Sequence, residues 1–171
     1  MRISTKKLVI GALMAAMCFI ATRFTQIPTG LGGYIHIGDL FVFLCAFLPG
    51  GFTGAAAAGL GSALADLLSP YPIYTLPSFV IKAVMAYVVY LLTHRRSPLG
   101  FTTILATVLG SIIMMVGYFF VDLACYGIAQ TGMLNMLVSS WPQALFGVVA
   151  SYIVLIPLTK AGLVKKFRDI R

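Results

Sequence analysis

Residues 101–124, FTTILATVLGSIIMMVGYFFVDLA, hold a single charged side chain, Asp122, in an otherwise apolar run. A helix needs about 20 apolar residues to cross the hydrocarbon core of a bilayer, and this stretch is long enough. The whole chain has the same character, because 60% of its 171 residues are hydrophobic, 9% are charged and its mean hydropathy is +1.01. Since a soluble domain is about 25% charged, the sequence excludes a soluble enzyme.

Further apolar segments lie on both sides of this run, separated by connections rich in Gly, Pro or polar residues. Together they predict an all-α integral membrane protein, a compact bundle of six transmembrane helices that forms a single domain over residues 1–171. The expected spans are about 8–24, 39–48, 52–68, 78–93, 101–124 and 139–159. The second segment is too short to cross as a straight helix, so we expect it to be tilted and extended into its flanks, or partly re-entrant.

Basic residues predict the orientation of the bundle. The N-terminal tail, the connection after residue 93 and the end of the chain hold 10 of the 12 Lys and Arg residues. With six spans these three segments lie on one side, and cytoplasmic loops are the ones enriched in Lys and Arg. We therefore expect both termini to be cytoplasmic and the protein to span the cell (plasma) membrane.

The remaining composition excludes other classes of function. The net charge of +8 reflects a low number of acids (4) more than a high number of bases (12), so we expect no nucleic-acid partner. Membrane lipid is expected around the apolar spans. The cysteines, Cys18, Cys45 and Cys125, lie singly in apolar runs, with the spacing of neither a disulfide framework nor a metal site. We interpret them as core residues and expect no bound metal.

Ionisable residues within or beside the spans gather in one half of the predicted bundle, the outer half. They are Arg23, Asp39, Asp66, Lys82 and Asp122. A charge at membrane depth is costly and usually faces a cavity, a partner charge or a pathway. Each residue alone could cap a helix or reach the interface, but five on the same side favour a polar vestibule that is open to the outside.

Aromatic and amide side chains lie at the same end. Tyr118, Asp122 and Tyr126 recur at i, i+4 and i+8 and so share one helical face. An aromatic belt decorates any membrane interface, but apolar walls with a few convergent polar groups are typical of a small-molecule site. We predict a site for a small, flat, polar ring compound. The candidate substrate-binding residues are Tyr34, His36, Tyr74, Lys82, Tyr118, Asp122, Asn135, Trp141 and Gln143.

Small residues recur in the first span, in its half nearer the predicted cytoplasmic side. Ala12 and Ala16 are four residues apart, as are Gly11 and Ala15. Small residues at this spacing let helices in lipid approach closely. Both docking to another membrane protein and packing against the protein's own helices would explain the stripe.

Four motifs give the chain a resemblance to a known family. They are Ala12-Leu13-Met14-Ala15-Ala16, Tyr34-Ile35-His36-Ile37-Gly38-Asp39, Pro49-Gly50-Gly51-Phe52-Thr53-Gly54 and Gly59-Leu60-Gly61-Ser62-Ala63-Leu64-Ala65-Asp66-Leu67. Over nearly its whole length the chain resembles the substrate-binding S components of prokaryotic energy-coupling factor (ECF) vitamin transporters. It is most similar to the hydroxymethylpyrimidine and pyridoxine type.

The resemblance implies a function and a set of partners. An S component captures a vitamin outside the cell and associates with a transmembrane coupling subunit (EcfT-like) and two ECF ATPases. ATP is then hydrolysed by those partners, so no cofactor is expected in this chain. The family's Ala-x-x-x-Ala docking motif maps onto Ala12 and Ala16. Pyridoxine, pyridoxamine, a pyrimidine and riboflavin all remain open as ligands.

Two other classes compete with this interpretation. An intramembrane aspartyl protease would use Gly-x-Gly-Asp, but His36 precedes Ile37-Gly38-Asp39 and no Tyr-Asp motif exists. A rhomboid-type protease would use Gly-x-Ser-Gly, and Gly61-Ser62-Ala63 lacks the second Gly. We therefore predict that the protein is not an enzyme. A self-contained small carrier or channel stays open, because hydrophobic periodicity alone does not exclude it.

Overall fold

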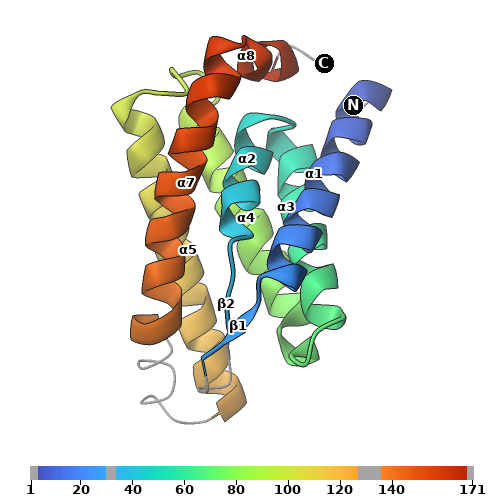
Figure 1. Ribbon diagram of the computed structural model, residues 1–171, viewed down its shortest axis with the longest axis vertical. Coiled ribbons are helices and arrows are strands. Elements are labelled where there is room, and N and C mark those ends of the chain that lie inside the picture. The colour runs from blue at the N-terminus through green and yellow to red at the C-terminus, as the bar shows by residue number, and fades with distance from the viewer. Residues whose placement is uncertain (1–3, 30–33, 127–135, 169–171) are drawn as a thin grey trace.

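The computed structural model describes residues 4–29, 34–126 and 136–168, and the structural statements below concern these residues. They form a bundle of helices with a short pair of antiparallel strands at one end (Figure 1). The helices are α1 (Thr5–Phe24), α2 (Asp39–Phe47), α3 (Gly51–Leu67), the 3-10 turn η1 (Pro72–Tyr74), α4 (Thr75–Thr93), α5 (Phe101–Tyr126), the π turn η2 (Met136–Ser140), α7 (Trp141–Lys160) and α8 (Leu163–Arg168). The strands are β1 (Ile27–Pro28) and β2 (Tyr34–Ile35).

The predicted all-α membrane fold is confirmed. Among the residues described, four helical segments are long and apolar enough to cross a membrane: α1, Pro72–Thr93, α5 and Val138–Lys160. The two other predicted segments coincide with α2 and α3, which have 9 and 17 residues. That α2 and α3 also belong to the membrane-crossing set stays a prediction. The strands, the turn η1 and helix α8 were not anticipated.

Helix α2 has 9 residues and lies at the centre of the bundle. Seven of its nine residues are buried, and Val42, Phe43, Cys45 and Phe47 have no exposed surface. After Asp39 the helix is apolar on every face, which is typical of a buried core. It packs against α1, α3, α4 and α7. Figure 1 shows that β2 leads to α2 from the end of the bundle where the strands lie. Between that end and the start of α2, the chain is therefore extended and not helical.

The small residues of α3 serve internal packing. A side-chain carbon at Gly61 would lie 2.6 Å from Cβ of Cys18 and would also meet the backbone carbonyl of Ala15, both on α1. Two turns nearer the start of α3, on the same face, Gly54 lies against the backbone carbonyl of Cys45 in α2. In lipid, close approach of this kind is a main source of helix association. These contacts join α3 to α1 and to α2.

The ends of the bundle agree with the orientation expected from the basic residues. Figure 1 shows the beginning of α1, the connection between α4 and α5, and α8 at the same end. The strands lie at the opposite end. We refer to these as the cytoplasmic end and the outer end, because the Lys- and Arg-rich segments share the first of them.

The tight contact at Gly61 gives a test of this packing. We expect Gly61→Ala to lower the stability of the bundle by about 1–3 kcal/mol, because overpacking a close contact forces the backbone to shift. The matched control is Gly100→Ala, whose new methyl group would lie at ordinary distances of 3.4 and 3.6 Å from Ser97. Thermal unfolding in detergent measures both. Equal melting temperatures would contradict the packing of α1 against α3.

Candidate functional site

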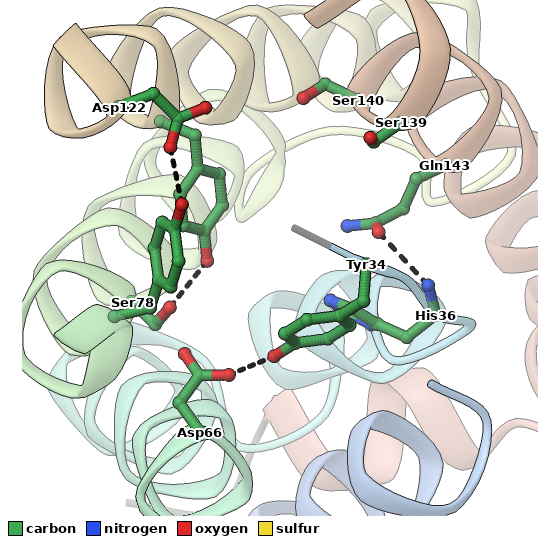
Figure 2. A pocket seen from close by; sticks show the side chains of 10 residues that line it. Tyr34, His36, Asp66, Ser78, Asp122, Ser139, Ser140 and Gln143 are labelled. Carbon is green, nitrogen blue, oxygen red and sulfur yellow. Dashed lines mark hydrogen bonds between the residues drawn. The ribbon is translucent and has the colours of Figure 1, made fainter. Parts of the chain in front are cut away.

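A polar cavity lies at the outer end of the bundle (Figure 2). Its lining comes from β2 and the turn after it, from η1 and η2, and from the outer ends of α3, α4, α5 and α7. The lining residues are Tyr34, His36, Asp66, Tyr74, Ser78, Tyr118, Asp122, Ser139, Ser140 and Gln143. The cavity has a volume of about 40 Å³, which is room for a few water molecules.

Hydroxyl groups hold the two carboxylates of the lining. The Tyr34 hydroxyl donates a hydrogen bond to Oδ1 of Asp66, and the Tyr74 hydroxyl donates one of 2.7 Å to Oδ1 of Asp122. Between these pairs, the hydroxyls of Ser78 and Tyr118 lie 2.7 Å apart. Figure 2 shows Asp66, Ser78 and Asp122 on one side of the cavity. This side is therefore built from acids and tyrosines.

The opposite side carries neutral polar groups. Figure 2 shows Ser139, Ser140 and Gln143 there, with His36 next to them. The amide oxygen of Gln143 accepts a hydrogen bond of 3.2 Å from the backbone N–H of His36, which fixes the chain just after β2. The two sides of the cavity thus differ in charge.

His36 is a neutral imidazole whose tautomer is defined by its surroundings. The backbone N–H of Gly38 donates a hydrogen bond of 3.0 Å to Nδ1, so the ring proton resides on Nε2. Burial lowers the pKa of His36 to about 4, and Lys82 adds to the shift while Asp39 opposes it. At neutral pH the ring is uncharged and offers one N–H donor at the cavity wall.

Behind the cavity lies a buried ion pair between Lys82 and Asp39. The Lys82 side chain has no exposed surface and that of Asp39 is 1% exposed. The ammonium group also contacts Sδ of Met114 at 2.9 Å and lies 5.4 Å from the ring centroid of Tyr118. The amide of Gln143 donates a hydrogen bond of 2.8 Å to the other carboxylate oxygen of Asp39. The cluster therefore joins α2, α4, α5 and α7.

The structure brings together six of the nine candidate substrate-binding residues. They are Tyr34, His36, Tyr74, Tyr118, Asp122 and Gln143. Lys82 is predicted as a contact residue but lies behind the lining, neutralised by Asp39. Asn135 lies outside the described residues. Four lining residues were missing from the candidate set: Asp66, Ser78, Ser139 and Ser140.

Trp141 is the candidate that the structure places elsewhere. It is not part of the described lining, and the residue is 60% exposed. The reason is helical geometry, because residues two apart on a helix point about 200° apart. Since Gln143 faces the cavity, Trp141 at the start of α7 faces outward. Its aromatic ring is typical of a membrane-interface residue.

At the cytoplasmic end, α1 presents two different stripes of small residues. Gly11 is buried and Ala15 half-buried against α3, whereas Ala12 and Ala16 are exposed. An apolar groove of about 400 Å³ runs between α1 and α3 beside them. It is lined by Leu8, Gly11, Ala12, Ala15, Phe52, Thr53, Ala56, Ala57 and Leu60. Internal packing explains the stripe of Gly11 and Ala15. It leaves the stripe of Ala12 and Ala16 uncovered.

Comparison with known proteins gives two similarities. Residues 2–164 match the family described as "ECF-type riboflavin transporter, S component". A protein of Pyrococcus woesei, described as "Uncharacterized protein in gap 3'region", is 37% identical over 109 residues, which cover 63% of this chain and 72% of that protein.

The ion pair behind the cavity gives a stability prediction. We expect Lys82→Met to destabilise the bundle by about 3–5 kcal/mol, because the variant leaves the buried Asp39 carboxylate without its cation. Adding Asp39→Asn should restore much of the loss, since the amide still accepts a hydrogen bond from Gln143. Thermal unfolding of the single and double variants in detergent measures the coupling. Purely additive losses would show that the two side chains do not depend on each other.

Proposed function

Because the chain belongs to the family of S components of ECF-type riboflavin transporters, we propose that it captures a small vitamin or vitamin precursor outside the cell for ATP-driven uptake. Proteins of this family are substrate-binding membrane subunits of transporters and not enzymes. The chain is thus a multi-pass protein of the cell membrane, and an intramembrane enzyme is excluded. A self-contained carrier or channel is disfavoured by the same membership.

The outer polar cavity is the proposed binding site. It combines tyrosine rings, on which a flat ring can stack, with donors and acceptors that converge from separate elements. Polar groups that converge on a cavity and fix the orientation of a ligand are typical of small-molecule sites. His36 would donate a hydrogen bond from Nε2, and the Ser139 and Ser140 hydroxyls would reach ring substituents. The hydrogen bonds that Gln143 makes support a role in positioning.

We further propose that the substrate is a vitamin B6 compound or hydroxymethylpyrimidine. The enclosed space of the cavity is small, about 40 Å³, so a bulky ligand would require the lining side chains to move apart. A compound with a single ring requires the least movement. Riboflavin, the vitamin in the family's name, has three fused rings and a ribityl chain and would require much more.

The proposed partners are the transmembrane coupling subunit and the two ATPases. The uncovered stripe of Ala12 and Ala16, with the apolar groove beside it, supports docking of the coupling subunit at α1. Small side chains there would let a partner helix approach closely. Substrate capture would then occur at the outer end and coupling to ATP hydrolysis nearer the cytoplasmic end.

Replacement of a stacking ring tests the site. We expect Tyr118→Ala to weaken vitamin binding about ten- to hundredfold, because an aromatic contact and a hydroxyl are lost together. The control is Trp141→Ala, which removes a larger ring outside the cavity and should leave affinity near normal. Mass spectrometry of small molecules released from the denatured protein identifies the ligand, and calorimetric titration measures its affinity. A larger effect at Trp141 than at Tyr118 would place the site elsewhere.

Added bulk on α1 tests the docking surface. We expect Ala16→Trp to reduce vitamin uptake strongly in cells that supply the coupling subunit and ATPases, while the isolated variant binds its ligand normally. The control is Leu105→Trp, which adds a ring at a side chain on α5 that is 53% exposed. Full uptake by Ala16→Trp would rule out docking at this stripe. Loss of both folding and binding would indicate internal packing instead.

A further inference from the structure

We infer that the outer cavity selects ring compounds that carry a positive charge, such as a primary ammonium group, over neutral rings of the same size. The inference rests on the proposed function, because it names the charge of the ligand that the proposed site takes. It follows from the distribution of charge around the cavity, and it separates this chain from a binder of neutral riboflavin.

The acids of the outer half outnumber its bases. The acids are Asp39, Asp66 and Asp122, and the bases are Arg23 and Lys82. Residues 30–33 and 127–135, which the structure does not describe, contain no Lys or Arg in the sequence. These two segments therefore add no Lys or Arg to the outer half.

Neither base is part of the described cavity lining, and each has a partner outside it. Lys82 is fully buried and pairs with Asp39. The Arg23 side chain donates a hydrogen bond of 3.0 Å to the backbone carbonyl of Leu68 and is not among the cavity-lining residues. The described lining thus contains two carboxylates, Asp66 and Asp122, and neither Lys nor Arg.

The two lining carboxylates are buried at membrane depth, where a cation placed beside them is favoured. Asp66 and Asp122 are 1% and 2% exposed, and their hydrogen bonds from Tyr34 and Tyr74 bring no positive charge. A buried charge is tolerated when an opposite charge accompanies it. A ligand cation placed on this side of the cavity supplies that charge.

The remaining walls suit the rest of such a ligand. Tyrosine rings attract cations through their negative faces, and Tyr74 and Tyr118 lie edge to face beside the carboxylates, with ring centroids 6.1 Å apart. Across the cavity, His36 and the hydroxyls of Ser139 and Ser140 are neutral and able to donate hydrogen bonds. A ring with an ammonium group on one side and hydroxyl or ring-nitrogen acceptors on the other matches both walls.

Pyridoxamine and pyridoxine test the inference directly, since they share one ring and differ by an aminomethyl group in place of a hydroxymethyl group. At pH 7 the amine is an ammonium. We expect calorimetric titration of the full-length protein in detergent to show at least tenfold tighter binding of pyridoxamine. Equal affinities, or tighter binding of pyridoxine, would overturn the inference.

Variants identify the groups responsible. Asp66→Asn and Asp122→Asn should each reduce the ratio of the two affinities, because each removes one negative charge and keeps the size of the side chain. The control Ser97→Lys changes the net charge by the same amount at the cytoplasmic end and should leave the ratio unchanged. Unchanged ratios in both Asn variants would overturn the inference, and the wild-type comparison decides it alone if the variants fail to fold.

The same measurements separate this inference from the proposed function. If the purified protein releases a neutral vitamin such as riboflavin and binds neither B6 compound, the charge preference is wrong and the S-component function stands. If it releases no small molecule and binds none of a panel of vitamins, the proposed capture of a vitamin fails, and the inference fails with it.

Discussion

The buried ion pair of Lys82 with Asp39 is the interaction on which the outer half of the bundle depends. Neither charge could remain at that depth alone, so α4 and the beginning of α2 must stay together. Gln143 and Met114 extend the cluster to α7 and α5. The cavity lies next to this cluster, because Gln143 belongs to both. The charges of Lys82 and Asp39 are neutralised by each other.

The length of α2 determines where that cavity can form. The helix starts in the interior of the bundle, and extended chain with Tyr34 and His36 replaces it toward the outer end. Extended chain has fewer side chains per unit length than a helix. Space and polar groups are thereby brought together at the outer end, while the apolar side chains of α2 lie in the core of the bundle.

The sequence predicted the helical membrane fold well, because long apolar runs and the placement of Lys and Arg are strong signals. It also predicted six of the lining residues, since buried polar groups are rare enough to stand out. It did not predict correctly which side chains point toward the cavity. Trp141 and Gln143 are two residues apart and face opposite ways, and Ser139 and Ser140 lie in a π turn that helical periodicity does not anticipate. The sequence also did not predict that Lys82 pairs with Asp39, because the two residues are 43 positions apart.

Among the described residues, no element contributes more than two side chains to the cavity lining, and those on the longer helices lie near their outer ends. Close packing of the core depends on other residues, such as Gly61 against α1 and the apolar side chains of α2. Ligand preference can therefore change by substitution of one helix-end residue at a time, without rebuilding the core. A scaffold of this kind is well suited to divergence, in which related chains keep the bundle and exchange the compound they carry.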